Sequence, residues 1–161
     1  MAWDAYLTVE GVSGESQRSG HEGQIEIIAF SFGGSNPSSV GTGGGGGTGT
    51  VSLSSFTVTK KTDASSAELF QQMCQGVHFP TAELTMYKSG GAAALAYLVY
   101  RFEELYVDSI QWQGAEGGDN IPMEIVSFSF GKVVVEYTEQ NPDGTAGGVH
   151  VGQWDVRTRI A

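Results

Sequence analysis

The chain contains the same strand-like pattern twice, and this repeat limits the folds that the sequence can adopt. Residues 25–33 read Ile-Glu-Ile-Ile-Ala-Phe-Ser-Phe-Gly, and residues 123–131 read Met-Glu-Ile-Val-Ser-Phe-Ser-Phe-Gly. Both copies alternate with the period of a β-strand, whereas no helical face would group these residues. The repeat therefore predicts two related β-strands, with a chance duplication in a β-rich chain as the alternative.

Alternation gives each copy of the repeat an aromatic face. Ile28, Phe30 and Phe32 should point to one side of the first copy, as should the even-numbered residues 126–130 of the second. We expect this side to pack in a core. The opposite side is half apolar and half small, which indicates a second contact surface outside that core.

The charge balance of the chain argues against several kinds of partner. Its 161 residues include 8 Lys and Arg and 18 Asp and Glu, which gives a net charge of −10. Nucleic acids and anionic membrane surfaces attract basic proteins, so we expect neither nucleic-acid binding nor membrane insertion. The single cysteine, Cys74, allows no intrachain disulfide and favours a reducing cytosol. No signal-peptide pattern begins the sequence, so we expect any export to proceed without a cleaved signal.

The remaining patterns complete a mainly β protein with a single domain over residues 1–161. Strands are predicted at 5–9, 51–60, 79–88, 94–102, 106–113 and 132–137. One short α-helix is predicted from Ser65 or Ser66 to Gly76, with Glu68 completing a capping box. Residues 149–161 are expected to form a terminal arm. The predicted fold is a β-barrel of antiparallel strands.

A glycine-rich segment separates the first repeat from the strand predicted at 51–60. Residues 34–49 include five consecutive glycines at 43–47, surrounded by Ser, Thr, Asn and Pro. Such a composition cannot bury enough apolar surface to order itself, so it predicts a long flexible loop.

No catalytic or metal-binding pattern is visible in the sequence. The three histidines lie in separate segments, without the spacing that metal ligands need. Cys74 lies on or beside the apolar stripe of the predicted helix, which favours a small buried side chain over a nucleophile. Glu103 and Glu104 are neighbours, so in a strand they should point to opposite faces and form no working pair. We therefore expect no enzyme, no cofactor and no metal.

Short motifs in a characteristic order run through the chain from about Ala2 to Gly148. They are Asp4–Leu7, Gly11–Ser16, His21–Ile28 with the following Phe-Ser-Phe-Gly, Gly43–Gly47, Thr57–Asp63, Ser66–His78, Tyr97-Leu98, Ser109, Glu124–Gly131 and Val135–Tyr137. By the order and spacing of these motifs the chain resembles the haemolysin-coregulated protein (Hcp) family, the tube protein of bacterial type VI secretion systems. It departs from the family at residues 90–96 and after Gly148.

The resemblance implies an assembly and a set of partners. Family members form a β-barrel with one side helix, and six copies form a ring. The rings stack head to tail into a tube that carries effector proteins in its lumen, with a spike protein at its tip and a contractile sheath around it. The protein would be cytoplasmic before firing, and would then be secreted to the extracellular space or a target cell.

The resemblance also implies roles for particular residues. Ser31 and Ser129 would face the lumen, with tight sheet packing as the alternative explanation for these small side chains. The glycine-rich loop would reach a neighbouring subunit or ring through Gly41, Gly43, Gly44, Gly45, Gly46, Gly47 and Gly49.

Two other functions are compatible with the strand pattern. A phage-like tail tube protein of another contractile injection system would share the fold. A monomeric ligand-binding β-barrel would instead show an aromatic-lined pocket with convergent polar groups.

Overall fold

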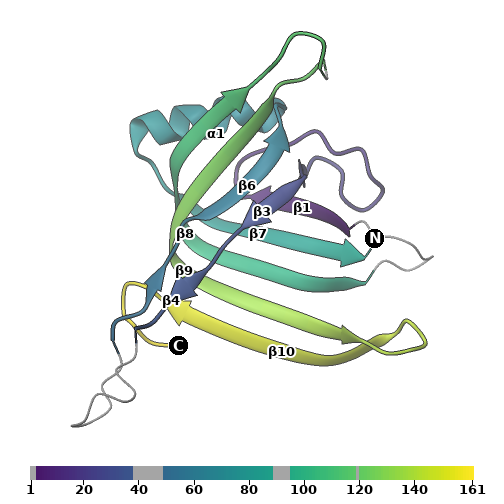
Figure 1. The fold of residues 1–161 in the computed structure, drawn as a ribbon, viewed down its shortest axis with the longest axis vertical. Helices are drawn as coiled ribbons and strands as arrows, with labels where there is room; N and C mark the ends of the chain where they lie inside the picture. Colours follow the sequence, from purple (N-terminus) through teal and green to yellow (C-terminus); the bar gives the residue numbers. More distant parts are fainter. Residues whose placement is uncertain (1–2, 38–48, 89–94, 119) are drawn as a thin grey trace.

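The computed structural model describes residues 3–37, 49–88, 95–118 and 120–161 (Figure 1). Its strands are β1 (Trp3–Val9), β2 (Ile25–Ile27), β3 (Ala29–Ser31), β4 (Gly34–Ser35), β5 (Ser52–Leu53), β6 (Phe56–Lys61), β7 (Phe79–Lys88), β8 (Ala96–Gln113), β9 (Met123–Gln140) and β10 (Ala146–Asp155), and its helix is α1 (Ala64–Gln75). The predictions of a mainly β chain and of one short helix are confirmed.

The main sheet nearly closes on itself. Its strands follow the order β2-β1-β7-β8-β9-β6-β3, and the registers between neighbours are antiparallel. The two ends of this order, β2 and β3, are consecutive in the chain, so β2 pairs with β1 and β3 pairs with β6. The first copy of the repeat is therefore the seam of an antiparallel barrel, as the sequence predicted for the fold class.

The two copies of the repeat form different strands. The second lies inside the continuous strand β9, with Val126 and Phe128 buried as predicted. The first bends at Ile28, whose N–H donates to the carbonyl of Thr59 at 2.8 Å. Ile25 and Ile27 are buried before this bend, whereas Phe30 and Phe32 contact the core after it. The prediction that Ile28 is a core residue was wrong, because the bend shifts the alternation by one residue and leaves Ile28 46% exposed.

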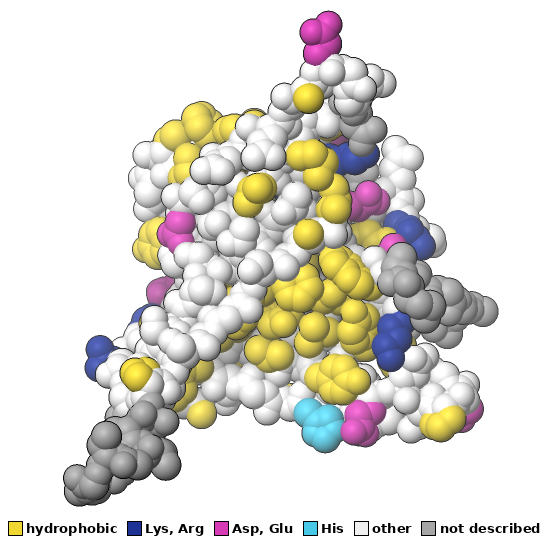
Figure 2. Space-filling model, in the orientation of Figure 1, with side chains coloured by type: hydrophobic (Ala, Val, Ile, Leu, Met, Phe, Trp, Pro, Cys, Tyr) yellow, Lys and Arg dark blue, Asp and Glu magenta, His cyan; other side chains and the backbone are white. Residues whose placement is uncertain are grey.

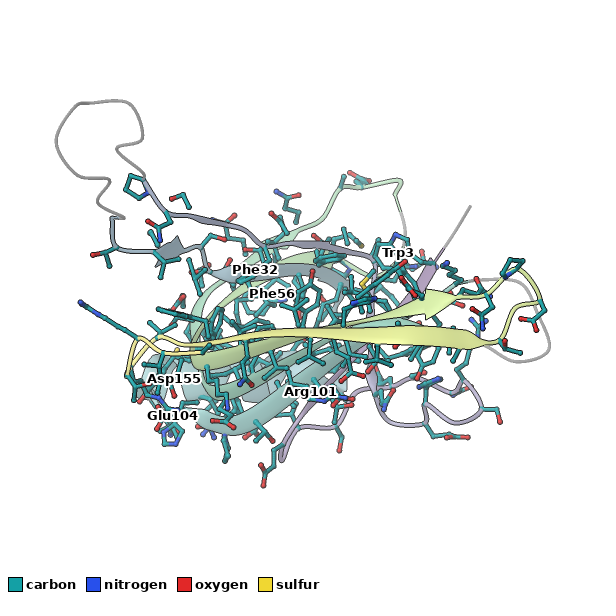
Figure 3. The ribbon with its side chains drawn as sticks, turned by 90° about the horizontal axis from the view of Figure 1, so that it is seen from below. Trp3, Phe32, Phe56, Arg101, Glu104 and Asp155 are labelled. Carbon is teal, nitrogen blue, oxygen red and sulfur yellow. The ribbon has the colours of Figure 1, made fainter. Side chains whose placement is uncertain are left out.

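Aromatic rings fill the core beside the seam. Phe56 is almost completely buried, and its ring centroid lies 5.8 Å from that of Phe30, 5.4 Å from that of Phe32 and 4.9 Å from that of Phe102. Figure 3 shows Phe32 and Phe56 next to each other inside the barrel. Such stacked, tilted and edge-to-face pairs stabilise a core beyond the apolar area that they bury.

Two long strands carry the sheet beyond the barrel. The strands predicted at 94–102 and 106–113 are one strand, β8, and β9 continues past the repeat to Gln140. β10 pairs with the second half of β9, from Gln140 to Lys132. Residues 149–161, expected to be a terminal arm, thus begin inside a strand at the bottom of Figure 1.

The helix cap lies earlier in the chain than the predicted caps at Ser65 or Ser66. Asp63 is the N-cap, and its carboxylate accepts from the Ser65 N–H at 2.9 Å. The hydroxyl of Ser66 accepts from the Asp63 N–H at 3.0 Å, so Ser66 takes the place predicted for Glu68 in the capping box. Gly76 ends the helix in the left-handed conformation, as predicted. Within the described ranges, no helix has the length and apolarity needed to cross a membrane.

A buried ionic cluster joins the start of the helix to the sheet. Lys60 in β6 and Glu124 in β9 are register partners, and their side chains are 1% and 0% exposed. The Lys60 ammonium lies 2.5 Å from Glu124 and 2.9 Å from Asp63, and it also donates to Ser66 at 3.0 Å. Glu124 accepts from the hydroxyls of Ser66 and Thr62. Buried charges are tolerated when they are paired and hydrogen-bonded, and both conditions hold here.

We predict that Glu124→Gln lowers the free energy of unfolding by about 3 kcal/mol, because removal of one partner leaves a buried ammonium incompletely paired. Urea denaturation followed by circular dichroism measures the change.

Glu83→Gln is the matched control, because Glu83 pairs with Arg101 on the outer surface, where both side chains are more than 40% exposed (Figure 3). This exposed pair should contribute less than about 1 kcal/mol. A loss at Glu124 as small as that at Glu83 would contradict the prediction.

Candidate assembly surfaces

A row of hydroxyl side chains crosses four neighbouring strands. Ser31 in β3 lies beside Thr57 in β6, Thr57 lies beside Ser127 in β9, and Ser127 lies beside Ser109 in β8. The sequence neighbours of Thr57 and Ser127 are buried, so these two side chains point out of the barrel. Ser31 and Ser109 are their register partners and therefore lie on the same side of the sheet. The hydroxyls of Thr57 and Ser127 are 3.0 Å apart. We call Ser31, Thr57, Ser127 and Ser109 the hydroxyl row.

Ser129 lies on the same outward side of β9 as Ser127, two residues further along the strand. Its hydroxyl donates to one oxygen of Asp108 at 2.9 Å, and Ser55 donates to the other oxygen at 3.0 Å. Asp108 sits where the register between β8 and β9 shifts by one residue. The sequence reading identified Ser31 and Ser129 but missed Asp108, because strand alternation does not reveal a bulge.

The predicted loop glycines fall largely outside the described residues. Gly41, Gly43, Gly44, Gly45, Gly46 and Gly47 lie there. Gly49 is described, and its N–H donates to the carbonyl of Pro37 at 2.7 Å. A Cβ at Gly49 would lie 2.6 Å from that oxygen, so this closure of the loop base needs glycine. Next to it, Gly34 and Ser35 pair with Leu53 and Ser52.

Apolar side chains gather on one face of the molecule. Figure 2 shows them at its centre, between the positions of β3 and β10 in Figure 1. Half-buried residues that pack against the core include Trp3, Phe30, Phe32, Tyr97, Leu98, Tyr100, Phe130, Val135 and Trp154. Because a monomer rarely leaves a wide apolar patch in contact with water, this face indicates a contact with another molecule.

The carboxylates of Glu103 and Glu104 were predicted to point to opposite faces, but both pair with Arg157. Arg157 lies 3.5 Å from Glu103 and 2.9 Å from Glu104. The prediction that the two side chains diverge was wrong, because Glu104 adopts a left-handed backbone conformation with φ of 52°. Gly131 leaves room for this group, since a Cβ there would lie 3.0 Å from both the Glu104 carboxylate and the Arg157 guanidinium.

Asp155 organises the C-terminal turn. Its carboxylate accepts from the backbone N–H groups of Arg157 at 2.9 Å and Thr158 at 3.0 Å, and it pairs with the Arg157 guanidinium at 3.0 Å. The Arg157 side chain, together with these N–H donors, holds the pKa of Asp155 well below its usual range. Figure 3 shows Glu104 and Asp155 at the same end of the sheet.

The described residues offer no cluster of three or more His, Cys, Asp or Glu side chains that could hold a metal ion.

The prediction that Cys74 is buried was wrong. Leu69 is the helix residue that enters the core, whereas Cys74 is exposed. The imidazole ring of His21 stacks on the ring of Tyr6, with ring centroids 4.1 Å apart.

Comparison with known proteins points to one family. A family model described as type VI secretion system effector, Hcp, matches residues 6–137. The chain is 35% identical to protein hcp1 of Pseudomonas aeruginosa, over 99% of each chain. The solved structure of a type six secretion system protein is similar with a TM-score of 0.92 at 34% identity, and that of Hcp1 from Salmonella typhimurium with a TM-score of 0.79 at 28% identity, each over 99% of both chains.

We predict that acid loosens the C-terminal turn. Because the pKa of Asp155 is lower in the folded chain than its ordinary value of about 3.9, the ionised carboxylate stabilises the turn above about pH 4, and this stabilisation is lost as the pH falls further. The NMR shifts of the Arg157 and Thr158 amides should therefore stay constant from pH 7 to about 4 and move below it.

Asp155→Asn is the control, since it removes the titrating group and should give nearly pH-independent shifts for these two amides. A midpoint above about pH 5 in the unmodified chain would contradict the assignment.

Proposed function

Because this chain belongs to the Hcp family of type VI secretion system proteins, we propose that it is a tube subunit that forms six-membered rings stacked head to tail. The family consists of secretion-system components and is not a family of enzymes. In the proposed assembly the lumen carries effector proteins, a spike protein lies at the tip, and a contractile sheath surrounds the tube. The chain would be cytoplasmic before firing and secreted afterwards, without cleavage of a signal peptide.

The hydroxyl row is the observation that carries this proposal. The wall of a transport lumen must stay wetted, and it must hold cargo without trapping it on a large apolar surface. Ser31, Thr57, Ser127 and Ser109 give one outward face of the barrel a band of short polar side chains across four strands. Ser129 and Asp108 extend this polar surface. We assign the face to the lumen, with Ser31 and Ser129 facing the bore.

The apolar face between β3 and β10 supports the ring. Apolar side chains gather on this face (Figure 2), and a monomer rarely leaves such a patch in contact with water. A contact between unlike patches closes into a ring when the rotation between copies allows it. The fold therefore has both an outward face crossed by a band of hydroxyl side chains and a face that favours association.

We predict that Ser31→Arg leaves ring formation intact and lowers cargo binding at least about tenfold. A long charged side chain would narrow the bore, and removing water from its guanidinium group when cargo binds would cost free energy. Light scattering and negative-stain imaging measure the rings, and co-purification of co-expressed effectors measures the cargo.

Thr8→Arg is the matched control, because Thr8 is an exposed residue of β1, a strand outside the row. Intact Ser31→Arg rings with normal cargo binding would show that Ser31 merely fills tight sheet packing.

The glycine-rich loop is proposed to reach a neighbouring subunit or ring. We predict that deletion of residues 41–49 leaves a folded protomer and weakens stacking, so that the tubes become shorter in electron micrographs. Serine at positions 43–47 keeps the loop length and should preserve the tubes, because reach depends on chain length. Tubes of unchanged length in the deletion variant would overturn this role.

A further inference from the structure

A carboxylate stands beside the hydroxyl row and is held in place by two serines. Asp108 lies at the bulge of β8, and its two oxygens accept hydrogen bonds from Ser129 at 2.9 Å and from Ser55 at 3.0 Å. Ser129 belongs to β9, whereas Ser55 lies between β5 and β6, so two distant parts of the chain fix this carboxylate. A side chain that is already fixed loses little conformational freedom when a ligand binds it.

The charge of Asp108 is not neutralised by the described part of its own chain. Both of its donors are neutral hydroxyls, and no cation among the described residues forms an ion pair with it. Glu83 and Glu136, by contrast, each pair with an arginine. A carboxylate offers about four acceptor positions, and the two serines use one on each oxygen. Each oxygen of Asp108 can therefore accept a further donor from another molecule.

A small hollow adjoins this carboxylate. It has a volume of about 150 Å³, and both serines that bind Asp108 are among the residues that line it. Leu53, Phe130 and Trp154 give it apolar walls. Lysine and arginine side chains suit such a place, because they lay their methylene groups along apolar surface and keep the charged group at its edge. We call the hollow and its carboxylate the Asp108 site.

An exposed aromatic ring lies next to the Asp108 site. Tyr106 is the register partner of Ser129 and is 44% exposed, and its ring lies beside that of His78, with ring centroids 5.7 Å apart. The face of a tyrosine ring attracts cations, and the planar guanidinium of arginine stacks on it, which the ammonium of lysine does not. A guanidinium also matches the two oxygens of a carboxylate. These groups therefore fit arginine best.

We propose that the Asp108 site binds arginine side chains on the surface of cargo proteins, so that the tube selects basic cargo; this inference rests on the proposed function. Ser129 lies on the face that we assign to the lumen, and a ring would repeat Asp108 once per copy around the bore. Rings of carboxylates are a known means by which pores favour cations. The wall would thus add a charge preference to the wetted surface of the hydroxyl row.

Charge complementarity favours a basic protein as the occupant. The chain has a net charge of −10, so it attracts basic proteins and repels acidic ones, a further copy of itself included. A small inorganic cation would neutralise Asp108 but would leave the apolar walls of the hollow and the ring of Tyr106 unused. An arginine side chain uses all three features at once.

A labelled peptide tests the site directly. The probe is a fluorescent peptide in which arginine alternates with glycine, and the comparison peptide carries citrulline, which has nearly the same shape and no charge, in place of every arginine. Fluorescence anisotropy with the full chain measures binding at about pH 8, where histidine side chains are generally neutral. Asp108→Asn should weaken binding of the arginine peptide at least about tenfold and leave that of the citrulline peptide unchanged. Asparagine keeps the size of the side chain, and circular dichroism verifies the fold.

Glu116→Gln is the matched control, because it also removes one negative charge, from an exposed residue of the loop between β8 and β9. This control should change binding of the arginine peptide less than about twofold, since an isolated exposed charge contributes little. Tyr106→Leu should weaken binding of the arginine peptide about threefold, and should affect a peptide with lysine at the same positions less.

Co-purification links the site to folded cargo. Rings of the unmodified chain should retain a small basic protein better than an acidic protein of the same size, and rings of Asp108→Asn should lose much of this preference. Light scattering of the same samples measures whether the rings are intact.

The outcomes separate this inference from the proposed function. Equal binding of the arginine peptide by the unmodified chain and by Asp108→Asn, or an equal loss in Glu116→Gln, would overturn the Asp108 site and leave the ring proposal standing. A chain that stays monomeric at high concentration would overturn the ring proposal and, with it, the role of the site in cargo selection. The peptide measurement needs no ring, so the two failures are distinguishable.

Discussion

The buried pair of Lys60 and Glu124 is the constraint on which the rest of the structure depends. These side chains face each other across β6 and β9, at the position where the helix also begins. An unpaired ammonium in this environment would be strongly unfavourable, so β6, β9 and the helix cap have to form together. Asp63 serves the cap and the cluster at once. One set of polar contacts therefore fixes the strand register and the place of the helix.

The bend at Ile28 determines which surfaces the barrel leaves for other contacts. Before it, β2 completes the sheet at β1, and after it, β3 completes the sheet at β6. Because alternation changes phase there, Ile25 and Ile27 enter the core while Ser31 turns outward into the hydroxyl row. A straight strand would have kept Ile28 in the core, and its whole length would have paired with a single neighbouring strand. The same bend thus closes the barrel and presents Ser31.

Features that depend on a local sequence pattern were predicted correctly from the sequence. Alternation predicted the antiparallel β class, and Gly76 predicted the helix end. The lumen-facing roles of Ser31 and Ser129 remain predictions. The errors came from contacts between distant residues. The left-handed turn at Glu104, the bulge at Asp108 and the pairing of Lys60 with Glu124 all depend on which strands become neighbours. Periodicity within one segment contains no information about that choice.

The distribution of cations argues that self-association of this chain depends mainly on apolar contact. Arg18, Arg101 and Arg157 each pair with carboxylates of their own chain, and Lys60 is buried. These internal pairs neutralise much of the small positive charge before a second copy approaches. The surface charge that is left unpaired is mainly negative, so two copies of the chain repel each other across most of their surface. They can approach each other where apolar side chains are exposed. Repulsion elsewhere then favours one defined contact over many, which is the condition for a closed ring.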